Sequence, residues 1–126
     1  MDKAQLQNRT KSFAIRVFKM AEKLPKSKGA EVITYQIIKA SSSVAANYRA
    51  VCRAKSKADF INKLKIVEEE SDESLFWLEF IADLELIHKK LLKNLIKEAD
   101  ELVSIFTAAL KTSKTNRKSK IPNRKS

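Results

Sequence analysis

A single glycine and two prolines among 126 residues constrain this chain more than any other feature of its sequence. Tight β-turns rely on these residue types, so a chain with so few of them lacks the turn material of a β-sheet protein. Alanine, leucine, isoleucine, lysine and glutamate are abundant instead, and most of these residues favour helix. We therefore expect an all-α fold, in one domain built around one core.

Apolar residues recur at helical spacing in four stretches, which predicts four amphipathic helices. Ser56, followed three residues later by Asp59, forms a pair like a capping box and marks the start of the third helix. Short links between helices are typical of an up-down-up-down bundle, here expected over residues 1–112. A basic tail, residues 113–126, has one apolar residue and is expected to be disordered. The four helices are expected at about residues 5–23, 30–54, 56–87 and 92–111.

Charge is distributed unevenly along the chain. Residues 1–66 carry a net charge of +11, residues 67–110 carry −7, and residues 111–126 carry +7. A basic half and an acidic half favour two functions, binding to a nucleic acid and head-to-tail association of subunits. The alternatives are a solvated face and ion pairing between adjacent helices of one bundle.

Basic residues form two stripes at helical spacing, one on each of the first two expected helices. If these helices are neighbours, the stripes could follow a phosphate backbone. Because no aromatic residues are interleaved with them, we do not expect sequence-specific reading of single strands. The candidate nucleic-acid contacts are Arg9, Arg16, Lys39, Arg49, Arg53, Lys55, Lys57 and Lys63.

The second half of the third helix carries more apolar surface than one buried face requires. Trp77, Phe80, Ile81 and Leu84 are therefore candidate residues of a subunit interface. Asn47 is the one polar residue on the core stripe of the second helix. We expect its side chain to satisfy backbone groups or a partner side chain, or to set the register between helices.

The remaining reactive residue types do not form a recognisable catalytic or metal site. Glu85 and His88 have the spacing of a di-iron motif, but the chain contains one histidine and such sites use two of these motifs. Cys52 has Arg49 and Arg53 as neighbours and no histidine nearby in sequence, so a small buried side chain is the default. The acidic run from Glu68 to Glu73 is typical of a solvated or inter-subunit face. We therefore expect no enzyme activity, no cofactor and no metal.

No signal peptide or membrane-spanning stretch is evident in the sequence. One cysteine rules out an internal disulfide and fits a reducing compartment. The sequence therefore predicts a cytoplasmic protein without a membrane partner.

The segment from Gln36 to Glu79 carries a family resemblance. Its marks are the run ASSSVAANYR at residues 40–49, the pair Arg53-Ala54, and the pattern from Asp72 to Glu79. Over about residues 8–115 the chain resembles the four-helix-bundle proteins named for bacterial ribosomal-RNA intervening sequences. It departs from many members in having Ala50-Val51 where they carry an acidic residue.

The resemblance implies a left-handed four-helix bundle that associates into a ring, typically of five subunits. A related branch, the accessory proteins of diversity-generating retroelements, comprises basic pentameric barrels that bind a reverse transcriptase and nucleic acid. We therefore expect a non-enzymatic oligomeric scaffold or adaptor whose basic surface contacts nucleic acid, with RNA favoured over DNA. The alternative is an oligomeric module that binds only proteins, for which a reverse transcriptase is one example of a partner.

Overall fold

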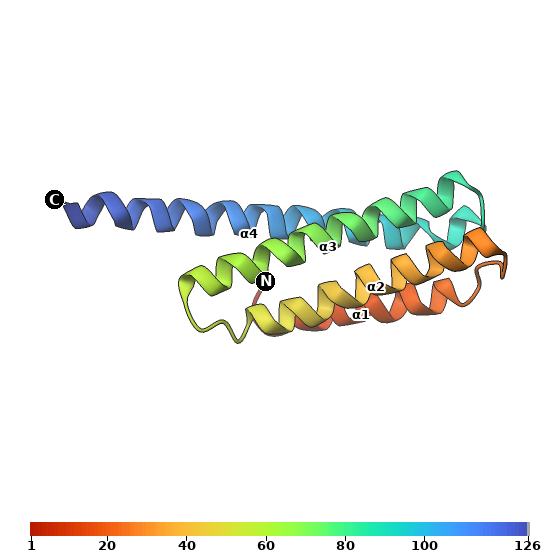
Figure 1. Ribbon diagram of the computed structural model, residues 1–126, viewed down its shortest axis with the longest axis horizontal. Helices are drawn as coiled ribbons and strands as arrows, with labels where there is room; N and C mark the ends of the chain where they lie inside the picture. Colours follow the sequence, from red (N-terminus) through yellow and green to blue (C-terminus); the bar gives the residue numbers. More distant parts are fainter. Residues whose placement is uncertain (126) are drawn as a thin grey trace.

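Four antiparallel helices form the part of the molecule that the structure describes (Figure 1). The computed structural model describes the backbone of residues 1–125 and the side chains of residues 1–115. Helices α1 (Lys3–Ala21), α2 (Lys28–Val51), α3 (Lys57–Asp83) and α4 (Lys93–Lys125) run up-down-up-down, and a short 3-10 turn, η1 (Lys89–Leu91), precedes α4. Each helix packs on the next in sequence, and α1 also packs on α4, less extensively. The all-α bundle predicted from the sequence is confirmed.

The core is a single apolar cluster to which all four helices contribute. Tyr48 of α2 and Phe106 of α4 meet across it with ring centroids 5.5 Å apart. Buried hydroxyl side chains on α1, α2 and α3 bond back to their own helices; Ser71, for example, donates to the carbonyl oxygen of Val67 at 2.7 Å. Over the described side chains, no buried polar atom lacks a hydrogen-bond partner. The largest fully buried side chains are Phe13, Phe106, Ile37, Leu64, Leu78, Ile81, Leu92 and Leu102.

Side-chain caps set the starts of the helices. Asp2 and Gln5 form a capping box at the start of α1, with both reciprocal hydrogen bonds present. At α3 the expected pair is confirmed, because the Ser56 hydroxyl accepts from the Asp59 amide at 3.1 Å. The Asp59 carboxylate accepts from the amide of Lys55, one residue before the cap. The connection between α2 and α3 is thereby held by backbone-to-side-chain bonds at its α3 end.

The end of α3 differs from the expectation. The helix stops at Asp83 instead of continuing to residue 87, because Glu85 adopts a left-handed backbone conformation with φ of 54°. This reversal lets Leu86 and Ile87 pack back onto the core. Helix α2 also ends earlier than expected, at Val51, and the amides of Arg53 and Ala54 bond in a tightened turn.

The helical backbone of α4 runs through Lys125 and extends past the other helices (Figure 1). The tail predicted to be disordered, residues 113–126, lies largely outside the side chains that the structure describes. Among the described residues, no helix combines the length and the apolar character needed to cross a bilayer.

Candidate interaction surfaces

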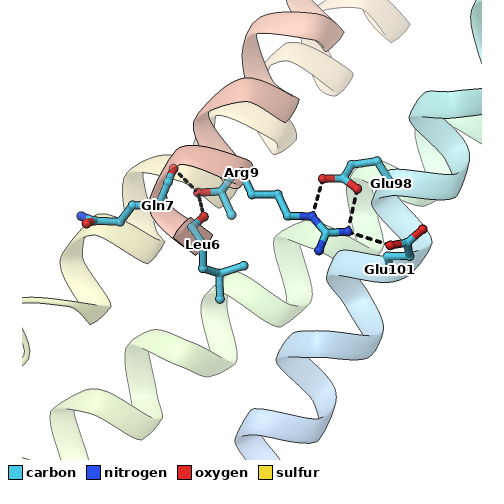
Figure 2. Close-up of polar contacts among 6 residues, drawn as sticks. Leu6, Gln7, Arg9, Glu98 and Glu101 are labelled. Atoms are coloured by element: carbon cyan, nitrogen blue, oxygen red, sulfur yellow. Dashed lines mark hydrogen bonds and ion pairs between the residues drawn. The ribbon is translucent and has the colours of Figure 1, made fainter. Parts of the chain in front are cut away.

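Arg9 does not present a free charge, because it closes the seam between α1 and α4 (Figure 2). Its guanidinium donates two hydrogen bonds to Glu98, at 2.7 and 2.8 Å, and one to Glu101 at 2.8 Å. The hydrogen bond to Glu98 and, to a smaller extent, that to Glu101 raise the pKa of Arg9 above its ordinary value. The structure therefore assigns Arg9 to the cohesion of the bundle, which corrects the hypothesis that it contacts nucleic acid.

Lys63 is also engaged within the subunit. Its ammonium group donates to the Asp59 carboxylate at 2.9 Å, one helical turn away. This hydrogen bond and the one from the Lys55 amide lower the pKa of Asp59. Lys63 is thus a weaker candidate for a phosphate contact than the basic residues of α2, Lys39 and Arg49.

The two basic stripes do not form the continuous surface that the sequence suggested. On α1, Arg16 faces α4 and lines a groove of about 320 Å³ with Lys19, Lys23 and Lys90. On α2, Arg49 faces the opposite side of α1 and lines a groove between α1 and α2 with Lys11, which the sequence analysis did not single out. The stripes lie on opposite sides of α1 because its α4-facing and α2-facing residues differ by about half a helical turn.

A cluster of cations at one end of the bundle, which we call the basic end, consists of Lys3, Arg53, Lys55 and Lys57. All four side chains are exposed, and in residues 1–115 none of them forms an ion pair. Lys3, Lys55 and Lys57 surround a hollow of about 320 Å³ at the α2–α3 connection. The Lys57 ammonium nitrogen lies 5.8 Å from the ring centre of Phe60, which restricts it by a cation–π contact.

The start of α1, the α2–α3 connection and the extended part of α4 all lie at the same end of the molecule (Figure 1). Residues 49–57 alone hold four cations and no acid. Lys3 belongs to this cluster through the fold alone, since 50 residues separate it in sequence from Arg53. The basic end is therefore a concentration of unpaired positive charge on the described part of the chain, separate from the groove that Arg16, Lys19, Lys23 and Lys90 line between α1 and α4.

Most of the outward surface of α2 forms a mixed stripe, which we call the α2 face. Val32 and Tyr35 are 59% and 64% exposed, although both are large apolar or aromatic side chains. Beside this stripe, the groove between α1 and α2 has a volume of about 760 Å³ and is edged by the exposed side chains of Ile15 and Phe18. The α2 face consists of Val32, Tyr35, Lys39, Ser42, Ala46 and Arg49.

A second exposed stripe runs along α3, and we call it the α3 stripe. Phe76, Trp77 and Phe80 pack on one another, with ring centroids 4.9 to 5.7 Å apart. Phe76 is 51% exposed and Leu84 is 49% exposed, so much of this aromatic cluster faces solvent. The α3 stripe consists of Ile66, Glu69, Glu73, Phe76, Phe80 and Leu84.

The candidate interface residues divide between surface and core. Phe80 and Leu84 are exposed and Trp77 is half-buried beside them, as an interface would require. Ile81 is wrong as an interface residue, because its side chain is completely buried in the core of its own bundle. The sequence analysis did not include Phe76 among the candidate interface residues, although its position one turn before Phe80 indicates the same stripe.

The acidic run on α3 is partly used inside the bundle. Glu68 accepts a hydrogen bond from the Thr107 hydroxyl of α4 at 2.7 Å, and Glu73 accepts one from the Trp77 indole at 3.3 Å. Glu69 and Asp72 are exposed and carry unpaired negative charge among the described residues. This leaves an acidic segment in the α3 stripe, next to its aromatic part.

Two residues that could suggest chemistry, Asn47 and His88, have structural roles. Asn47 donates from its amide nitrogen to the backbone and hydroxyl oxygens of Ser43, so it satisfies a backbone group on its own helix. His88 accepts from the Lys90 amide through Nδ1 and caps η1. Burial, followed by the influence of Cys52, raises the pKa of Tyr48 to about 12. Within the described residues, no three potential metal ligands come together.

Comparison with known proteins places this chain in a family. One solved structure, a protein of unknown function from the S23 ribosomal protein family of Bacteroides thetaiotaomicron, is 28% identical. The match covers 88% of this chain and 99% of that one, with a TM-score of 0.79. None of the curated proteins that were compared matches this chain. The family described as 23S rRNA-intervening sequence protein matches residues 2–108, and the chain therefore belongs to that family.

Proposed function

We propose that this protein is a non-enzymatic, oligomeric helical scaffold whose basic end contacts the phosphate backbone of RNA. The observation that carries the proposal is the convergence of Lys3, Arg53, Lys55 and Lys57 at one end of the bundle, without acidic partners in residues 1–115. Flexible cations of this kind neutralise phosphates without reading base sequence. The family's name refers to 23S rRNA, which favours RNA over DNA.

Assembly supports the proposal further. Several copies in the same orientation would gather their basic ends on one surface. A weak contact of each copy would then be multiplied by the number of copies, and a pentameric ring would present five such sites.

A filter-binding assay with a structured RNA at low salt tests the proposal. The variant Arg53→Ala/Lys55→Ala/Lys57→Ala should lose at least tenfold in affinity. The matched control, Lys23→Ala/Lys26→Ala/Lys28→Ala, removes the same charge at the opposite end of the bundle and should change affinity much less. Equal losses in the two variants would show that net charge alone retains RNA, and that the basic end has no special role.

The exposed aromatic cluster of α3 favours a second candidate function, an oligomeric module that binds only proteins. A complex recovered from cells that survives nuclease treatment and high salt, and that is lost in Phe76→Ser, would support this alternative. Absence of RNA retention by the wild-type protein would support it as well.

A further inference from the structure

The α2 face and the α3 stripe have matching patterns. The residues of the α2 face lie 19, 16, 12, 9, 5 and 2 positions before Val51, where α2 ends. In that order they are Val32, Tyr35, Lys39, Ser42, Ala46 and Arg49. Four residues of the α3 stripe lie 19, 16, 12 and 9 positions after Lys57, where α3 begins. In that order they are Phe76, Glu73, Glu69 and Ile66. Because the two helices share one connection and run in opposite directions, residues with equal counts lie at about equal heights in the bundle.

Three of the four pairs of side chains at equal heights are complementary in chemistry; in the fourth, Tyr35 lies level with Glu73. Lys39 lies level with Glu69, each about 18 Å along its helix from the connection. Val32 lies level with Phe76, and both are more than half exposed. Ser42, which lines the groove between α1 and α2, lies level with Ile66, whose side chain is 42% exposed. The cation Lys39 is therefore level with the acid Glu69, and the small residue Ser42, beside the groove, is level with the exposed side chain of Ile66.

These stripes cannot satisfy each other inside one subunit, because both point away from the core of the bundle. They can meet only between copies. From this geometry we propose that the α3 stripe of one copy packs against the α2 face of the next copy, with Lys39 beside Glu69. This inference rests on the oligomeric scaffold proposed above and names the two surfaces that would build it.

Charge selects this pairing over the symmetric alternative. If two α3 stripes met about a two-fold axis, Glu69, Asp72 and Glu73 of both copies would lie together and repel. Pairing with the α2 face instead brings Glu69 to Lys39 and separates the acids of the two copies. The two faces are different patches, so the contact is heterologous, and each copy retains one unused face until a ring closes.

The register also fixes the orientation of the copies. Equal heights meet only when neighbouring copies stand the same way up, which corresponds to rotation about an axis parallel to the helices. All basic ends then lie on one rim of the assembly. The groove of about 760 Å³ beside the α2 face would receive the Ile66 side chain, since Ser42 and Ala46 leave room there.

A charge exchange tests the proposed pair. Lys39→Glu and Glu69→Lys should each raise the protein concentration at half-assembly about tenfold at low salt, measured by light scattering after size exclusion. The double variant carrying both changes should return to within about threefold of the wild type, because the pair is restored with its signs exchanged. Lys97→Glu, an exposed reversal on α4, is the matched control and should have little effect.

Mixing defective copies tests the heterologous geometry. Tyr35→Asp should disable the α2 face and Phe76→Asp the α3 stripe, and each variant alone should be monomeric with a wild-type helical content by circular dichroism. An equimolar mixture retains one intact pair of faces and should form a dimer without larger species. Assembly lost in Phe76→Asp but retained in Tyr35→Asp would overturn the inference and indicate pairing of α3 stripes.

The outcomes separate this inference from the proposed function. A wild-type protein that stays monomeric at high concentration would contradict both the pairing and the oligomeric scaffold. A wild-type oligomer in which the double variant fails to recover would contradict the pairing alone. Loss of RNA retention in Lys39→Glu and Tyr35→Asp with unchanged assembly would show that the α2 face is occupied by nucleic acid instead of a second copy.

Discussion

Replacement of Arg9 by methionine should weaken the seam between α1 and α4 (Figure 2). Methionine keeps most of the aliphatic stem of Arg9 but removes three hydrogen bonds to carboxylates. The Glu98 side chain is only 15% exposed, so its carboxylate would be left largely desolvated and unpaired. The Glu101 side chain is 48% exposed, so its bond adds little in water.

From these contacts we expect Arg9→Met to lower the free energy of unfolding by about 2 kcal/mol. At this chain length the loss corresponds to a decrease in Tm of roughly 6 to 8 °C. Urea unfolding followed by circular dichroism measures it, at a fixed protein concentration because assembly also stabilises the fold. The pKa of Arg9 is raised, so its contribution is fully present below its ordinary pKa and would be lost only in strong alkali.

Two controls make the experiment specific to the ion pair. Arg16→Met lies two turns along the same side of α1, among lysines, and should be neutral or slightly stabilising. Adding Glu98→Gln to Arg9→Met should recover part of the lost stability, because the stranded carboxylate is removed. Unfolding of Arg9→Met within about 0.5 kcal/mol of the wild type would refute the view that this pair holds the seam.

Three further predictions concern the core and the pH dependence of stability. The pKa of Tyr48 is raised from about 10 to about 12, so stability should fall as the pH rises between these values, and Tyr48→Phe should show a flatter urea-unfolding profile over that range. Hydrogen bonds from Lys63 and the Lys55 amide lower the pKa of Asp59. Its contribution to the free energy of unfolding is therefore present above its ordinary pKa and is lost as the pH falls below about 4. Acid unfolding of Asp59→Asn should lack this pH dependence. Phe106→Ala removes a fully buried ring that packs on Tyr48, and should cost about 3 to 5 kcal/mol by urea unfolding, whereas Phe76→Ala on the surface should cost much less.

Helix content and core positions could be predicted from the sequence because both follow from local rules. The scarcity of glycine and proline and the 3-4 spacing of apolar residues gave the four helices, and Ser56 with Asp59 marked the start of α3. The end of α3 could not be placed, because its left-handed residue is Glu85 and not the glycine or asparagine that usually signals such a stop. The packing of Leu86 and Ile87 on the core accompanies this turn, and such packing is a tertiary effect.

The candidate site was less predictable, because it depends on which helix faces lie together. Arg9 and Arg53 both lie on predicted basic stripes of the sequence. Arg9 meets two glutamates that lie about 90 residues away, whereas Arg53 is exposed at the basic end. Lys3 joins the cluster only through the fold. Ile81 and Phe80 are neighbours of similar hydropathy, and the rotation of α3 buries the first and exposes the second.

The salt dependence of RNA affinity tests the central claim most directly, since its slope reports the number of phosphates neutralised. Wild type and the variants at the two ends of the bundle would be compared in one titration series. We expect the slope of log affinity against log salt to fall in magnitude by about 2 in Arg53→Ala/Lys55→Ala/Lys57→Ala, and to stay near the wild-type value in Lys23→Ala/Lys26→Ala/Lys28→Ala. Equal slopes in the two triple variants, or a wild-type affinity that does not depend on salt, would contradict it.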